Sequence, residues 1–178
     1  MAIEYRTEPE YIEYLDGERH PKVSPRSAHS VLAAQLVLIL ADCGARAHGT
    51  VLVEGDAVVR QSGGKRTKLV PDVSFMTRQQ LEGLHGRDAQ YPPVGPSIAI
   101  EIWSPGDSEG YLARKIERYL GTGSHLVLDV RIDARTVAAF TAAGARTFTE
   151  HDRFENAPFP WFSFEVREVF SVLDELPK

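Results

Sequence analysis

The segment Ser97-Ile98-Ala99-Ile100-Glu101-Ile102-Trp103 decides how this chain folds. Its aliphatic residues alternate as in a β-strand, so that Ile98, Ile100 and Ile102 share one face and Glu101 lies on the other. A buried carboxylate without a partner is costly, or it takes up a proton. The segment therefore predicts a core strand whose acid is matched by a bound cation or by a basic side chain.

A second acid, Asp72, lies in a similar apolar run, Leu69 to Phe75. Alternation again places the acid on the face opposite the large apolar side chains. If the two strands are neighbours with these faces aligned, Asp72 and Glu101 can share one cation. Mg²⁺ prefers hard oxygen ligands and often needs only one or two carboxylates. The alternative is that Asp72 follows Pro71 in a turn while Glu101 meets an arginine.

Lys115 is the third candidate, on a predicted helix that follows the Glu101 strand. On a helical wheel it falls within the apolar arc, between Tyr111 and Tyr119. Such a lysine either extends outward to solvent or points at an anion inside the protein. Beside a metal-bound water, it can orient that water or offset charge on a phosphate.

The remaining sequence predicts helices and strands around these three residues. Predicted helices cover residues 8–15, a segment from Ser27 or Ser30 to Asp42, and 109–120, with a helical turn at 77–84, a loop at 84–96 and a short helix at the C-terminus. Predicted strands cover residues 18–23, 50–54, 57–60, 68–76, 97–103 and 125–130, then a hairpin of 136–141 and 146–149 and a last strand at 159–164. This order indicates an α/β (α+β mixed) fold, a central mixed β-sheet flanked by helices, and one domain over residues 1–178.

Composition limits the class of protein. The chain has 178 residues, 43% of them apolar, and a net charge of -5. That charge argues against a general nucleic-acid coat protein but allows a nuclease with a local basic face. The single cysteine, Cys43, forms no internal disulfide, and neither a signal peptide nor a transmembrane segment is expected. The sequence predicts a cytoplasmic protein with no membrane contact.

The chain resembles the Uma family, a group named as putative restriction endonucleases within the PD-(D/E)XK nuclease superfamily. The resemblance begins at Glu13-Tyr14-Leu15-Asp16-Gly17-Glu18, includes Ser24-Pro25 and His29, and is strongest at Val70-Pro71-Asp72-Val73-Ser74-Phe75 and Ile100-Glu101-Ile102-Trp103-Ser104-Pro105. It then extends through Lys115, Tyr119 and Gly121 to Leu126-Val127-Leu128-Asp129. No single piece is diagnostic, but their order and spacing are fairly specific.

This resemblance implies a restriction-endonuclease-like sheet and a DNA endonuclease in which Asp72 and Glu101 bind Mg²⁺ or Mn²⁺. The usual superfamily pattern has a lysine two residues after the glutamate, where this chain has Trp103; the Uma-like pattern has it on the next helix, matched by Lys115. Glu18 and His29 match recurrent family positions and are accessory candidates. A homodimer is compatible with cutting both strands. The competing hypothesis is a catalytically inactive domain of the same fold that binds nucleic acid or another protein.

Overall fold

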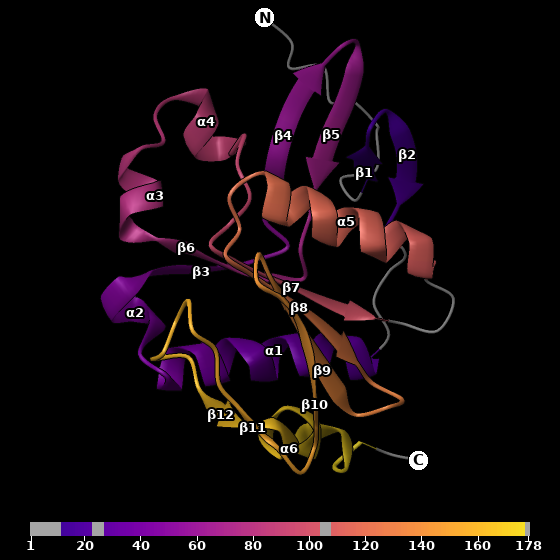
Figure 1. Ribbon diagram of the computed structural model, residues 1–178, viewed down its shortest axis with the longest axis vertical. Coiled ribbons are helices and arrows are strands. Elements are labelled where there is room, and N and C mark those ends of the chain that lie inside the picture. The colour runs from indigo at the N-terminus through magenta and orange to yellow at the C-terminus, as the bar shows by residue number, and fades with distance from the viewer. Residues whose placement is uncertain (1–11, 23–26, 104–107, 177–178) are drawn as a thin grey trace, which may run out of the picture.

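A six-stranded sheet forms the centre of the protein. The computed structural model describes residues 12–22, 27–103 and 108–176 (Figure 1). The strand order is β10-β9-β8-β7-β6-β3. These strands are β3 (Gly49–Val53), β6 (Val73–Thr77), β7 (Ile98–Trp103), β8 (Leu126–Arg131), β9 (Thr136–Thr141) and β10 (Gly144–Thr149). β7 and β8 are parallel, whereas the other neighbouring pairs are antiparallel, so the predicted mixed sheet is confirmed.

Helices cover both faces of this sheet. α5 (Glu109–Gly121) connects β7 to β8 and lies on one face, and α1 (Ser27–Asp42) lies on the other (Figure 1). The alternation in β7 explains both contacts. Its isoleucines belong to the cluster that contains Leu32, Leu36 and Leu40 of α1. Ala99 belongs to the cluster with Leu112, Ile116 and Tyr119 of α5.

α1 is apolar nearly all round because it packs on more than the sheet. It also contacts α6 (Val166–Phe170) and the 3₁₀ helix η1 (Ser171–Leu173). Leu38 is an exception and is 59% exposed. Among the described helices, none is long and apolar enough to cross a membrane.

A smaller four-stranded sheet, of order β2-β1-β5-β4, packs on α5. Its strands are β1 (Ile12–Leu15), β2 (Glu18–Pro21), β4 (Ala57–Ser62) and β5 (Lys65–Leu69). Leu15, Val58 and Leu69 of this sheet share the cluster of α5. α5 therefore lies between two sheets, and its polar residues within that layer are removed from water.

The remaining elements are short. They are α2 (Ala45–His48), α3 (Arg78–Glu82), α4 (Arg87–Gln90), β11 (Arg153–Phe154) and β12 (Phe164–Glu165). α3 begins with a capping box. The Thr77 side chain accepts a hydrogen bond from the backbone N–H of Gln80, and the Gln80 side chain accepts one from the backbone N–H of Thr77. α4 lies within the segment 84–96, for which the sequence predicts a loop.

Four sequence predictions of secondary structure are wrong, the loop 84–96 that contains α4 being one of them. Residues 12–15 of the predicted helix 8–15 form strand β1, and residues 8–11 lie outside the described ranges. The predicted strand 68–76 is two strands, β5 and β6, in different sheets. Pro71 lies between them, where it cannot donate a ladder hydrogen bond. Of the predicted strand 159–164, only Phe164 is in a strand, β12.

Candidate active site

Asp72 and Glu101 lie across from each other at the carboxyl end of β7. β6 and β7 are antiparallel neighbours, and their last paired residues at this end are Val73 and Ile100. One step further, the same register places Asp72 opposite Glu101. Residues directly opposite each other on adjacent strands have their Cβ atoms close together. The two acidic segments are neighbours as predicted, but Asp72 contacts His29 of α1 whereas Glu101 contacts Lys115 of α5, so a cation shared by both acids stays a prediction.

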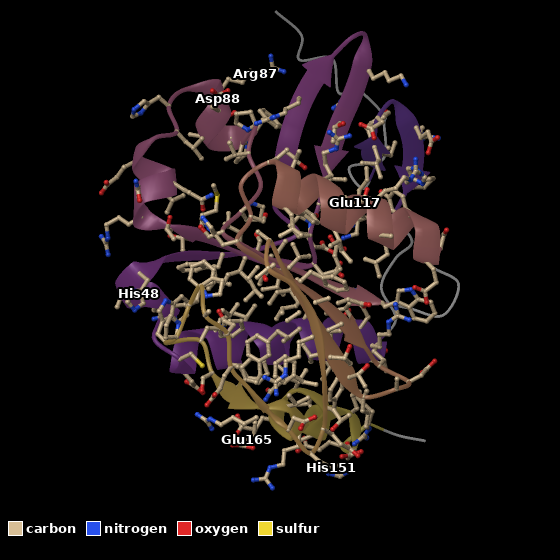
Figure 2. All side chains as sticks on the ribbon, viewed as in Figure 1. His48, Arg87, Asp88, Glu117, His151 and Glu165 are labelled. Carbon is tan, nitrogen blue, oxygen red and sulfur yellow. The ribbon has the colours of Figure 1, made fainter. Side chains whose placement is uncertain are left out.

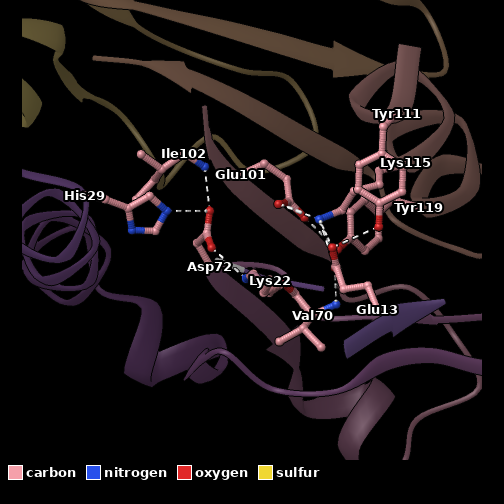
Figure 3. Close-up of polar contacts among 10 residues, drawn as sticks. All are labelled: Glu13, Lys22, His29, Val70, Asp72, Glu101, Ile102, Tyr111, Lys115 and Tyr119. Carbon is pink, nitrogen blue, oxygen red and sulfur yellow. Dashed lines mark hydrogen bonds and ion pairs between the residues drawn. The ribbon is translucent and has the colours of Figure 1, made fainter. Parts of the chain in front are cut away.

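Asp72 is buried, and both of its carboxylate oxygens have polar partners (Figure 3). Its Oδ1 accepts a hydrogen bond from Lys22 Nζ at 2.8 Å. Its Oδ2 accepts one from the Ile102 amide at 2.7 Å and lies 3.3 Å from His29 Nε2. Burial alone would raise the pKa of Asp72, but the His29 contact and the Lys22 charge lower it below its usual value. Asp72 is therefore a carboxylate at neutral pH.

Glu101 lies on the α5 face and has a different environment. It is 6% exposed. Its Oε2 is 2.7 Å from Lys115 Nζ, and its Oε1 accepts a hydrogen bond from Tyr119 Oη at 2.7 Å. Burial raises the pKa of Glu101 to about 7, with the charges of Asp72 and Glu13 adding to the effect and Lys115 opposing it. A cation beside this carboxyl would relieve the accumulated negative charge.

Glu13 is a site residue that the sequence reasoning missed. Its position beside a turn is typical of an exposed acid, yet it is 2% exposed. Its Oε1 accepts a hydrogen bond from the Val70 backbone amide at 2.7 Å, and its Oε2 accepts one from the Tyr111 hydroxyl at 2.9 Å (Figure 3). Burial alone would raise its pKa, but the ammonium group of Lys115 lowers it below the usual value.

Lys115 connects Glu13 to Glu101. Its ammonium group is 2.9 Å from Glu13 Oε1, 3.1 Å from Glu13 Oε2 and 2.7 Å from Glu101 Oε2. Of the two alternatives that the sequence leaves open, the lysine points at anions inside the protein. Burial would lower its pKa, but the two carboxylates raise it above the usual value. Lys115 is therefore protonated at neutral pH.

Lys22 is a second residue that the sequence reasoning missed. It follows β2 and donates to both the Val70 carbonyl and Asp72, each at 2.8 Å. Burial would lower its pKa, whereas the charge of Asp72 raises it. Its partners, Val70 and Asp72, are distant in the chain, so no local sequence pattern indicates that Lys22 belongs to the site. Its placement follows from the β1–β2 hairpin, half of which the sequence analysis assigns to a helix.

The two accessory candidates are placed differently. His29, on α1, contacts Asp72 and belongs to the group in Figure 3. Glu18 does not. Its side chain is 58% exposed and pairs with Arg114 at 2.6 Å and with His20 at 3.5 Å. The structure therefore separates Glu18 from the acids that it was predicted to assist.

The fit of a metal ion rests on two carboxylates. Within residues 12–22, 27–103 and 108–176, no group of three or more His, Cys, Asp or Glu side chains is arranged to hold a metal ion. Two hard oxygen donors still match Mg²⁺, which commonly completes its shell with water and substrate phosphate.

A family model described as "Putative restriction endonuclease", Uma2, matches residues 2–167. This chain belongs to the Uma2 family. The resemblance predicted from the sequence is thereby confirmed. Among curated proteins, none matches this Uma2 chain.

One similar solved structure is a crystal structure of a protein from Anabaena variabilis ATCC 29413, described as a "putative nuclease belonging to DUF820". The two structures superimpose with a TM-score of 0.78, at 19% sequence identity, over 94% of each chain. At that identity the likeness establishes the fold. The predicted restriction-endonuclease-like architecture is confirmed.

Proposed function

We propose that this Uma2 protein is an endonuclease that hydrolyses DNA phosphodiester bonds with Mg²⁺ or Mn²⁺. The observation that carries the proposal is that Asp72, one residue before β6, accepts a hydrogen bond from the Ile102 amide, next to Glu101 on β7, while Lys115 lies 2.7 Å from Glu101. Membership of a family described as restriction endonucleases supports a nuclease, as does the likeness to a crystal structure described in the same terms. DNA as substrate and the identity of the metal belong to the proposal.

In this proposal Asp72 and Glu101 hold the metal ion. When bound, such an ion polarises the scissile phosphate and lowers the pKa of the attacking water. Lys115 offsets negative charge that develops on the phosphate and helps to position the water through its fixed charge. It does not act as a base in the resting state, because its pKa is raised by Glu101 and Glu13. His29 and Lys22 hold the carboxylate of Asp72 in its ionised form.

The experiment is plasmid nicking with Mg²⁺ or Mn²⁺. Asp72→Asn, Glu101→Gln and Lys115→Met are compared with the wild type and with Glu117→Gln, an exposed residue on α5 (Figure 2). Loss of a metal ligand or of charge stabilisation is expected to reduce the nicking rate by about 100-fold or more, while Glu117→Gln retains it. Equal nicking by all the variants would indicate a contaminating nuclease or another site.

One observation favours the competing function, an inactive domain that binds nucleic acid or another protein. The strand-lysine position is occupied by Trp103, whose ring has the Arg131 guanidinium 5.1 Å above it. Calorimetric titration with Mn²⁺ separates the two proposals. A nuclease binds the ion through Asp72 and Glu101, and either carboxamide variant weakens that binding. For an inactive domain, the heat of Mn²⁺ binding is the same in the wild type, Asp72→Asn and Glu101→Gln, or is absent from all three.

We also propose a cytoplasmic location and a homodimer that brings two sites to the two DNA strands. Cys43 is a free cysteine, which suits a reducing compartment. Fractionation of the native cell tests the first point. Sedimentation with and without duplex DNA tests the second.

A further inference from the structure

A second polar group lies beside Glu101 on the same face of the sheet. β7 and β8 are parallel neighbours, and Glu101 is paired with Asp129 and Trp103 with Arg131. Because side chains alternate along a strand, all four residues are on the α5 face at the carboxyl ends of these strands. In open α/β sheets, ligands bind outside the carboxyl ends of parallel strands. None of the roles assigned above uses Asp129 or Arg131.

Arg131 is held at the rim of this face by two carboxylates. Its Nε donates to Asp129 Oδ2 at 2.8 Å. Its two terminal nitrogens donate to the two oxygens of Glu109 at 2.7 and 2.8 Å. The side chain of Glu109 is 65% exposed, whereas that of Asp129 is 3% exposed. Asp129 is thus a buried partner of Arg131, and Glu109 is a partner that faces solvent.

Two buried polar atoms in this group have no partner in the part of the chain that the structure describes. They are Asp129 Oδ1 and the indole Nε1 of Trp103. An unsatisfied buried group is costly, and in native proteins it calls for a water, an ion or a ligand. The indole N–H can only donate, so its missing partner is an acceptor oxygen. Arg131 also has two N–H groups beyond the three that it donates to Asp129 and Glu109.

The chemistry of these donors identifies the ligand. A guanidinium fork that binds a carboxylate through two parallel hydrogen bonds also fits two oxygens of a phosphate. The exposed Glu109 therefore occupies the position that a phosphate group would take. Resting on the proposed function, we propose that Arg131 binds a backbone phosphate of the nucleic-acid substrate beside the scissile one. The phosphate displaces Glu109 from the Arg131 guanidinium.

The test measures binding without turnover. A fluorescein-labelled duplex of about 20 bp is titrated with protein in EDTA, and anisotropy is followed at several salt concentrations. Arg131→Gln is expected to weaken binding by about tenfold and to lower the slope of log K against log salt by about 1. Glu109→Gln is expected to tighten binding by about threefold, because it removes the competing anion. Arg131→Lys, which keeps the charge but loses the fork, falls between Arg131→Gln and the wild type.

The matched control is the pair of Arg153 and Glu165, whose side chains are joined at 2.8 Å. Glu165 lies near the bottom of the molecule in Figure 2, away from Glu117 on α5. Arg153→Gln and Glu165→Gln change the net charge by the same amounts, and each is expected to alter the affinity less than about twofold. Thermal unfolding confirms that every variant is folded before binding is compared.

The outcomes separate this inference from the proposed function. If the wild type binds the duplex but Arg131→Gln matches Arg153→Gln in affinity and salt slope, the inference is wrong while the nuclease proposal stands. Weaker binding by Glu109→Gln would also overturn it. If the wild type binds no duplex at any salt concentration, this inference is wrong, and the nicking experiment with Mg²⁺ or Mn²⁺ still decides the nuclease proposal.

Discussion

Lys115→Met tests whether one ammonium group keeps two buried carboxylates ionised. In the native protein its Nζ lies 2.9 Å from Glu13 and 2.7 Å from Glu101. Methionine retains the length and apolar contacts of the lysine stem, so the change removes charge more than volume. Both acids then remain in a layer between two sheets with no ammonium group between them.

The size of the effect follows from burial and from proton linkage. Removing one partner of a buried ion pair costs about 3–5 kcal/mol. Glu101 has a pKa of about 7, raised by burial from 4.5, so folding takes up a proton between these values and stability falls as the pH rises through them. In the wild type this fall stops above the folded pKa. In Lys115→Met the pKa of Glu101 rises further, so the free energy of unfolding keeps falling above pH 7. The stability deficit of the variant relative to the wild type therefore grows by about 1.4 kcal/mol per pH unit above about pH 7.

Urea unfolding followed by fluorescence of Trp103 and Trp161 at pH 6, 7, 8 and 9 measures this deficit. Arg114→Met is the control, because it removes a cation from the neighbouring position of α5 whose partner, Glu18, is solvent-exposed. Its effect is expected to be small and independent of pH. The reasoning is refuted if Lys115→Met costs no more than Arg114→Met, or if its cost is constant from pH 7 to 9.

Three further substitutions probe the same network. Tyr119→Phe removes the hydroxyl that donates to Glu101 Oε1 at 2.7 Å; we expect a loss of about 1.5–3 kcal/mol in urea unfolding and an upward shift of the pH at which nicking is half-maximal. Lys22→Met removes a cation that lowers the pKa of Asp72, so the stability lost between pH 7 and pH 3 should be smaller than in the wild type; an unchanged loss would contradict this. Glu18→Gln should leave both stability and nicking close to wild type, because that side chain is 58% exposed; a strong loss of nicking would restore it as a site residue.

The acids of the site can be predicted because they interrupt apolar strands. Asp72 and Glu101 are each a single charge in a run of residues that must be buried, and alternation alone assigns their faces. Lys115 is found in the same way, as a cation in the apolar arc of α5. The predicted face of Glu101 is confirmed by its contact with Lys115 of α5, whereas Asp72 precedes β6 and contacts His29 of α1, so strand alternation does not describe its side chain.

Glu13 and Lys22 escape prediction because their partners are distant in the chain and the hairpin that carries them resembles the end of a helix. The predicted helix 8–15 ends directly before Asp16-Gly17. In the structure both residues have positive φ, 52° for Asp16 and 90° for Gly17, as in the two-residue turn that joins antiparallel strands. An Asp-Gly pair between Leu15 and Glu18 is therefore an available hairpin signal. Recognising it places Glu13 on a strand and separates it from the exposed acids.

The position of the lysine on α5 also determines which cations remain for a substrate. An ammonium group has three N–H donors, and Lys115 makes three short contacts, two with Glu13 and one with Glu101. It therefore influences the site through its charge, and it has no donor to spare for a phosphate oxygen while these contacts last. A lysine on β7 at position 103 would instead project at the open end of the strand. With Trp103 there, Arg131 on the neighbouring strand is the basic group paired with that position. Loss of the strand lysine thus separates two roles, with Lys115 balancing the acids inside and Arg131 meeting the phosphate outside.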